Sequence, residues 1–176
     1  KRAMLRGADV TLISANMTAT PPDFINIVKV KSAADMFEAV KAEFDNCDIV
    51  IKAAAVADYT PTVTYDNKVK KKDGEMSISL KRTDDILKYL GEHKTHQFLC
   101  GFSMETENML ENSRAKLKKK NLDMIVANNL KVKGAGFGTD TNVVTIITEN
   151  NTKELPIMSK EEVANNILNE IMGIIK

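Results

Sequence analysis

The sequence predicts an α/β protein with a Rossmann-like, three-layer fold, in which a mostly parallel central sheet is covered by helices and a basic arm protrudes. Short, wholly apolar runs typical of buried strands alternate with amphipathic helical patterns. One long polar connection, rich in lysine, interrupts this alternation. No internal repeat or low-complexity linker divides the 176 residues, so a single domain, residues 1–176, is expected.

The first half of the chain predicts strands and helices in turn. Residues 1–7 have the pattern of the last turns of a helix with a glycine C-cap, so we expect at least one strand and its loop to precede residue 1. The β-branched run 10–13 predicts a strand. Residues 32–44 predict a helix, because Ser32 can cap its first turn and apolar side chains recur on one face. Residues 49–51 predict a short buried strand.

The second half continues the alternation. In chain order, the patterns predict a half-exposed strand at 76–80, a helix at 84–93, a strand at 98–102, a helix at 108–120, strands at 124–127 and 143–148, and an amphipathic helix at 161–175. Strands that are apolar on both faces favour a parallel sheet between two helical layers. Because such sheets bind ligands beyond the carboxyl ends of their strands, the segments after each strand are the candidate sites.

Composition and charge exclude several classes of protein. The formal net charge is +1, so no overall field favours nucleic acid, and no apolar run is long enough to span a membrane. No signal peptide is recognisable, and a cytoplasmic location is expected. The two cysteines, Cys47 and Cys100, are far apart and predict buried free thiols rather than a disulfide or a metal site. His93 and His96 flank a turn, which makes a histidine-based triad a poor interpretation.

The segment after the strand at 49–51 is K-A-A-A-V-A-D-Y, residues 52–59. Small side chains such as Ala54 permit a flat ligand to approach the backbone, and Asp58 offers acceptors to a hydroxyl or an amine. The alternative is the start of a helix packed on the sheet, with Asp58 as its cap.

Two lysine clusters could bind phosphates. Lys68 and Lys70 lie on the same side of an extended segment within the long connection 60–75. Lys116 and Lys120 share one face near the end of the helix at 108–120. Compact ammonium groups suit a polyphosphate that must be captured and released. For both clusters the alternative is a solvated surface.

Two further segments follow later strands. Gly101 permits tight backbone geometry, and Phe102 could stack on a base or simply cap the core. The polar, glycine-rich residues 127–140 could bind ligand amides or only turn the chain. No G-x-G-x-x-G or phosphate-loop lysine motif is present.

In their order along the chain, these segments resemble the phosphopantothenate–cysteine ligase family, whose bacterial members usually form the C-terminal half of a bifunctional protein. The matching stretches are A-A-A-V-A-D-Y, K-V-K-K, D-D-I-L, G-F-S-M-E-T-E, K-L-K-K-K-N-L-D-M-I-V-A-N and G-F-G-T-D-T-N, which together cover most of residues 52–144. Each stretch alone is a weak signal, whereas the ordered set is specific.

The resemblance implies a CTP-dependent reaction that joins 4′-phosphopantothenate to L-cysteine through an acyl cytidylate. It also implies Mg²⁺ on the triphosphate, a homodimer with exchange of the 60–80 arm between subunits, and no FMN on this chain. No metal-binding residues of the protein itself are expected. Two rival interpretations remain: a Rossmann-type oxidoreductase and a non-catalytic binding relative.

By resemblance, Lys68 is the expected catalytic residue, binding phosphate and stabilising charge. The expected nucleotide-binding residues are Ala54, Asp58, Lys68, Thr83, Asp84, Asp85, Ile86, Phe102, Lys116 and Lys120. Many relatives have N-P-D-I where this chain has Thr83 to Ile86, so the side-chain roles of Thr83 and Asp84 depart from the family pattern. A glycine-rich, asparagine-containing segment that relatives carry before this region is also expected to be required for activity.

Overall fold

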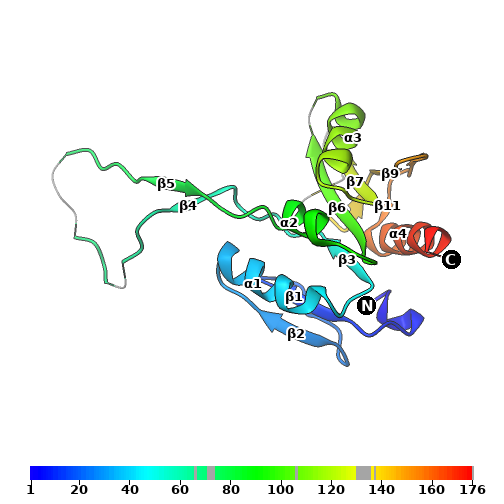
Figure 1. Cartoon of the computed structure of the whole chain (residues 1–176), viewed down its shortest axis with the longest axis horizontal. Helices are drawn as coiled ribbons and strands as arrows, with labels where there is room; N and C mark the ends of the chain where they lie inside the picture. The colour runs from blue at the N-terminus through cyan, green and yellow to red at the C-terminus, as the bar shows by residue number, and fades with distance from the viewer. Residues whose placement is uncertain (66, 71–73, 106, 130–135, 137, 176) are drawn as a thin grey trace.

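The computed structural model describes residues 1–65, 67–70, 74–105, 107–129, 136 and 138–175 (Figure 1). In chain order, its elements are the 3₁₀ turn η1 (Met4–Arg6), β1 (Thr11–Ser14), β2 (Asn26–Lys29), α1 (Ala33–Phe44), β3 (Ile49–Lys52), β4 (Tyr59–Pro61), β5 (Leu80–Arg82), α2 (Ile86–His93), β6 (Phe98–Glu105), α3 (Met109–Lys119), β7 (Met124–Asn129), β8 (Thr141–Asn142), β9 (Val144–Thr148), β10 (Thr152–Glu154), β11 (Met158–Ser159) and α4 (Lys160–Ile174).

The central sheet has five strands in the order β10-β9-β7-β6-β3. Strands β3, β6 and β7 pair in parallel, whereas β9 and β10 pair antiparallel at one side. The α/β class is therefore confirmed, with a mixed sheet whose central strands are parallel. The strand predicted at 10–13 is present as β1, but it pairs in parallel with β2 in a separate two-stranded sheet.

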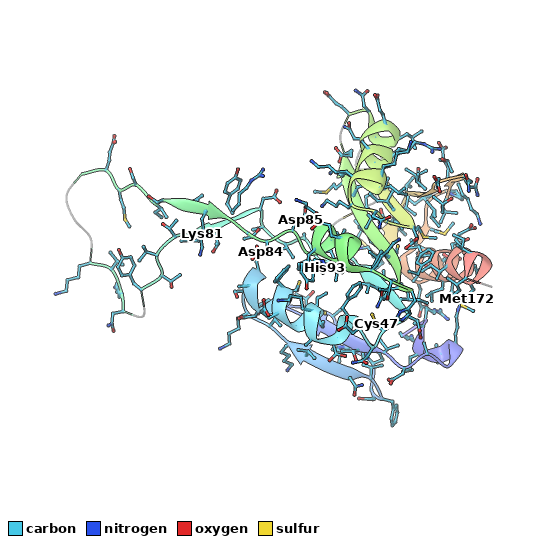
Figure 2. The ribbon with its side chains drawn as sticks, in the orientation of Figure 1. Cys47, Lys81, Asp84, Asp85, His93 and Met172 are labelled. Atoms are coloured by element: carbon cyan, nitrogen blue, oxygen red, sulfur yellow. The ribbon has the colours of Figure 1, made fainter. Side chains whose placement is uncertain are left out.

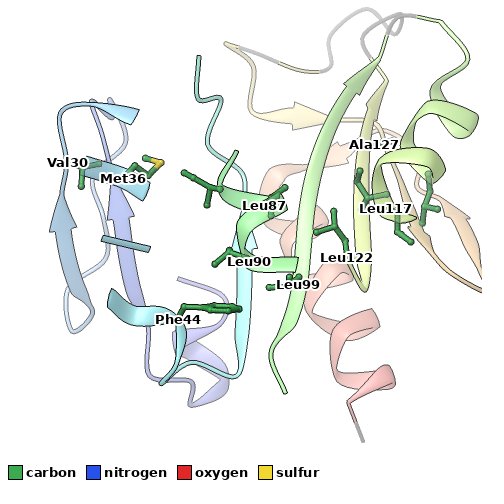
Figure 3. Close-up of a cluster of buried hydrophobic side chains, with 12 residues drawn as sticks. Val30, Met36, Phe44, Leu87, Leu90, Leu99, Leu117, Leu122 and Ala127 are labelled. Carbon is green, nitrogen blue, oxygen red and sulfur yellow. The ribbon is translucent and has the colours of Figure 1, made fainter. Parts of the chain in front are cut away.

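Two apolar cores lie on opposite faces of the central sheet, as a three-layer fold requires. On one face, residues of α1, α2 and α3 pack against β6 and β7, and Leu90 and Leu99 are fully buried there (Figure 3). On the other face, α4 packs through Val163, Ile167 and Ile171. Burial on both faces explains why the parallel strands are apolar throughout.

Two helices begin with the capping signal that their sequences carry. At α1, the Ser32 hydroxyl accepts the backbone N–H of Asp35 at 3.1 Å, and the Asp35 carboxylate accepts the N–H of Ser32 at 2.9 Å. Ser159 and Glu162 form the same reciprocal pair at α4. Such caps typically stabilise a helix by about 1 kcal/mol, and here they fix the helix starts that the sequence predicts.

The segment between β4 and β5 projects from the body (Figure 1). β4 and β5 pair antiparallel, and the ladder continues one step further through the N–H of Thr62 and the carbonyl of Ser79 at 3.0 Å. The predicted strand at 76–80 is wrong for most of its length, because β5 begins only at Leu80. Alternation favours a strand, but no second sheet covers the apolar side chains of 76–79, which stay exposed.

Both cysteines are free thiols. Cys100 is fully buried in β6, and burial raises the pKa of its thiol to about 12, which makes it unreactive near neutral pH. Among the described helices, none combines the length and the apolar character that a membrane span requires.

Candidate functional site

Two connections meet beyond the carboxyl end of β3. Residues 53–57 form neither helix nor strand, so the alternative of a helix start there is wrong. The backbone N–H of Thr83 donates to the carbonyl of Asp58 at 3.0 Å, and the Thr83 hydroxyl donates to the carbonyl of Ala57 at 2.6 Å. These two bonds fasten the alanine-rich loop to the segment that leads into α2.

Asp85 joins this loop region to α3. Its carboxylate caps α2 by accepting the N–H of Lys88 at 3.1 Å, and it pairs with the Lys120 ammonium group at 2.9 Å. Partial burial opposes ionisation of Asp85, but the hydrogen bonds from Lys120 and Lys88 outweigh it and hold its pKa below the ordinary value. The carboxylate is therefore ionised at neutral pH.

A close contact between α2 and the end of α3 positions Lys120. A Cβ atom added to Gly91 would lie only 1.8 Å from the backbone oxygen of Lys120, so only glycine permits this approach. The side-chain amide of Asn121, which has a left-handed φ of 50°, donates to the carbonyl of Gly91 at 2.8 Å. These contacts hold the end of α3 against α2 and place Lys120 beside Asp85. Asp85 and its neighbour Asp84 are labelled in Figure 2.

An open groove of about 410 Å³ lies at this junction. It is lined by Phe37, Arg82, Thr83, Asp84, Asp85, Lys88, Tyr89, Glu92, Lys119 and Lys120. Four of the residues predicted for nucleotide binding, Thr83, Asp84, Asp85 and Lys120, thus line one groove. The loop carrying Ala54 and Asp58, both exposed, is bonded to its edge.

Lys116 lies one turn before Lys120 on α3 and is exposed. Its ammonium group pairs with the Glu105 carboxylate at the end of β6, 2.5 Å away. Each of the two predicted helix lysines therefore has a carboxylate partner at the carboxyl end of the sheet. An incoming polyphosphate must compete with these carboxylates for the ammonium groups.

Two predicted residues have side chains in the apolar cores. Ile86 is 3% exposed and belongs to the core under α2, so only its backbone is available to a ligand. Phe102 is half-buried and packs against the core on the α4 face of the sheet. Its neighbour Gly101 faces α2, where an added Cβ atom would lie 2.8 Å from Leu87 Cδ1, so close helix packing explains this glycine.

The arm is the part of the predicted site that a single chain does not bring to the groove. Lys68 and Lys70 are exposed on the segment that projects from the body (Figure 1). Lys71 and Lys72 lie outside the described residues, as does most of the glycine-rich loop at 130–137. The role of the arm therefore stays a prediction.

The role of one residue near the groove was missed from the sequence. Lys52 ends β3, and its ammonium group donates to the carbonyl of Ala54 at 2.8 Å. A lysine that closes an otherwise apolar strand at its carboxyl end was the signal that could have identified it. Within the described part of the chain, no group of three or more acidic, histidine or cysteine side chains could hold a metal ion.

Comparison with known proteins identifies similar chains over nearly the whole length. The model of the family described as "DNA/pantothenate metabolism flavoprotein C-terminal domain" matches residues 1–174. The coenzyme A biosynthesis bifunctional protein CoaBC of Bacillus subtilis (strain 168) is 52% identical over 176 residues, which cover 99% of this chain and 43% of that protein. A cysteine/cysteine sulfinic acid decarboxylase of an unknown prokaryotic organism is 47% identical, covering 98% of this chain and 49% of that protein.

A solved structure shares the fold. The crystal structure of the C-terminal domain of a CoaBC protein superposes with a TM-score of 0.82 and 44% sequence identity, covering 98% of this chain and 79% of that chain. The present chain spans less than half the length of the two curated relatives above.

Proposed function

This chain belongs to the DNA/pantothenate metabolism flavoprotein C-terminal domain family, and from this premise we propose that it is the nucleotide-activating part of a phosphopantothenate–cysteine ligase. The observation that carries the proposal is the groove beyond β3, where loop 53–58, the segment 83–86 and Lys120 meet. This is the edge at which open α/β sheets bind their ligands.

The proposed reaction has two steps. The carboxylate of 4′-phosphopantothenate attacks the α-phosphorus of CTP, which forms an acyl cytidylate as the bond to pyrophosphate breaks. The amine of L-cysteine then attacks the acyl carbon, forms the amide and displaces CMP. Little acid–base chemistry is required for the first step, because the attacking carboxylate is already ionised near neutral pH. That requirement suits a site built from lysines and carboxylates.

The residues of the groove fit the binding of a nucleoside triphosphate. Asp58 and the small side chain of Ala54 lie on the loop proposed to hold the nucleoside. Lys116 and Lys120 would bind the triphosphate through charge-assisted hydrogen bonds. The segment from Thr83 to Ile86 contributes Thr83, Asp84 and Asp85 to the same groove. Its backbone can therefore bind the nucleotide, although the side chains of Thr83 and Asp84 depart from the family pattern. Phe102, three residues before the end of β6, is proposed to border the nucleotide, although its side chain packs on the α4 face of the sheet.

Mg²⁺ would bind chiefly to the phosphates and neutralise part of their charge. No residue of the chain is proposed as a dedicated Mg²⁺ ligand; the carboxylates that line the groove, Asp84, Asp85 and Glu92, could contact the bound ion. No flavin is proposed for this chain, and its location is proposed to be cytoplasmic.

The arm supports a further element of the proposal, a homodimer. By the β4–β5 register, Pro61 pairs with Leu80, and continuing the ladder places Val63 beside Ile78. Val63 and Ile78 are 59% and 63% exposed, an apolar face that a single chain leaves in water. A second copy could cover this face, and the same exchange would carry Lys68 of one subunit to the groove of the other.

Turnover by the full-length protein tests this proposal. We expect release of CMP and pyrophosphate that requires CTP, 4′-phosphopantothenate and L-cysteine together. The Lys68→Gln variant should lose acyl-cytidylate formation while its thermal unfolding is unchanged, because the Lys68 side chain is exposed. Turnover without CTP, or unchanged turnover by Lys68→Gln, would contradict the nucleotide or the catalytic assignment respectively.

A further inference from the structure

Lys52 lies on the same face of the central sheet as Lys120. In the parallel pairing of β3 with β6, Lys52 is the register partner of Gly101. A Cβ atom on Gly101 would meet Leu87 and Leu122, which belong to the α2 and α3 side of the sheet. Register partners on neighbouring strands point to the same face, so the Lys52 side chain also points toward α2 and α3.

The charge on Lys52 lacks a directly bonded counter-ion. Its ammonium group donates to the neutral carbonyl of Ala54, and within the described chain it forms no ion pair. Burial lowers the pKa of Lys52 and the nearby charge of Lys120 lowers it further, whereas Asp85 and Asp58 oppose the shift. Of these two neighbouring ammonium groups, only that of Lys120 is bonded to a carboxylate, that of Asp85.

Such an arrangement favours an incoming anion. A partly buried charge costs free energy unless a partner of opposite sign compensates it. An oxyanion placed between the two ammonium groups would compensate both, and the Lys52 ammonium group has donors beyond the one used by Ala54.

We propose that Lys52, which lies near the groove residues Asp85 and Lys120, is a further ligand-binding residue and binds the phosphate next to the nucleoside. This inference rests on the proposed nucleotide-binding function. Lys52 is bonded to the loop assigned to the nucleoside, whereas Lys116 lies one turn before Lys120 on α3 and pairs with Glu105. A fixed cation at that phosphate also stabilises the charge that develops there during nucleotidyl transfer.

Calorimetry of the 176-residue chain with CMP and with CTP tests the assignment. In Lys52→Met, which keeps most of the side-chain length without the charge, affinity for both nucleotides should fall by about tenfold or more. In Lys52→Arg both affinities should be largely retained. Lys94→Met is the matched control, because Lys94 is also partly buried and pairs with Asp123, but at the amino ends of β6 and β7.

A pH profile separates binding from a purely structural role of Lys52. Because the pKa of Lys52 is lowered by burial, affinity of the wild-type chain should fall as the pH rises toward the ordinary lysine pKa of about 10.4, and Lys52→Arg should show a smaller fall because its charge persists. Lys120, Asp85 and Asp58 face Lys52 and are unchanged in every variant, so differences between the profiles report on position 52.

The outcomes distinguish this inference from the proposed function. Unchanged affinities in Lys52→Met, or a loss with CTP but not CMP, would overturn the assignment of Lys52. If the wild-type chain prefers ATP to CTP, the proposed cytidine specificity fails, and the same comparison with AMP and ATP then decides the role of Lys52. A wild-type chain that binds none of these nucleotides contradicts both.

Discussion

Lys116 and Lys120 show how single residues can prepare a site for phosphate. Each ammonium group is paired with a carboxylate, Glu105 for Lys116 and Asp85 for Lys120. Such exposed or half-exposed pairs contribute little to stability, since solvent screens them. A triphosphate carries more charge than either carboxylate and can displace both. The pairs therefore hold the lysines near the sheet edge at little cost to binding.

Replacing these lysines separately should weaken CTP binding. We expect Lys116→Ala and Lys120→Ala each to lower CTP affinity by about 10- to 100-fold, the usual range for one charge-assisted hydrogen bond. Lys118→Ala is the control, because Lys118 lies on the same helix but two residues from each of them and on another face. Calorimetry measures all three. If Lys116→Ala and Lys120→Ala bind CTP as tightly as Lys118→Ala, this face of α3 does not bind the triphosphate and is only solvated surface.

Gly91 is the residue on which the α2–α3 contact depends. In Gly91→Ala, the higher helix propensity of alanine should raise the free energy of unfolding by up to about 1 kcal/mol. The added Cβ atom, however, would lie 1.8 Å from the backbone oxygen of Lys120. Overpacking of this kind costs about 1–3 kcal/mol or more, so we expect net destabilisation and weaker CTP binding as Lys120 moves.

Gly173→Ala provides the matched comparison for this prediction. Gly173 also lies in a helix, α4, but an added Cβ atom there would meet nothing within 4 Å. Its substitution should leave stability unchanged or slightly higher. Thermal unfolding measures both variants, and a Gly91→Ala variant as stable as Gly173→Ala would show that the contact is not constraining.

At the scale of elements, the arm combines an apolar face with a short ladder. Among the described residues of the arm, the strands are β4 and β5, three residues each, although alternation in the sequence continues beyond them. An isolated two-stranded ribbon is marginally stable in water. A partner surface would supply the burial that a single chain lacks, which is why the arm belongs to the proposed homodimer.

A charge on the apolar face of the arm should disrupt that dimer. We expect Ile78→Asp to shift the protein toward monomer, because the carboxylate would have to be buried at the interface without a partner. Ser77→Asp places the same charge on the opposite face of the extended segment and should leave the dimer intact. Analytical ultracentrifugation distinguishes the two. A monomeric wild type, or a dimeric Ile78→Asp, would contradict this role of the arm.

At the scale of the whole molecule, the sequence predicts elements better than their pairing. Capped helices such as α1 and buried strands such as β6 carry local signals, and both were located to within a few residues. The separate pairing of β1 with β2 has no such signal, because it depends on which neighbours are available in space. β2 itself is mostly exposed and short, and its sequence does not alternate strongly.

The same distinction applies to the candidate site. Residues directly after strands, such as Asp58, and the helix lysines could be selected because topology brings strand ends together. Lys52 was placed at the start of the segment after the strand, but no role was predicted for it, because its environment depends on a register partner nearly fifty residues away. The position of the arm relative to the groove could not be predicted, because under the proposed function it depends on contacts with a second chain.

The binding of CTP to this chain, measured by calorimetry beside ATP and NADP, tests the central claim most directly. Lysines of α3 and the loops beyond β3 are proposed to hold a pyrimidine nucleoside triphosphate. We therefore predict that CTP binds more tightly than ATP and that NADP does not bind measurably. Preferential binding of NADP would contradict the account and favour an oxidoreductase, while no binding of any nucleotide would favour a non-catalytic relative.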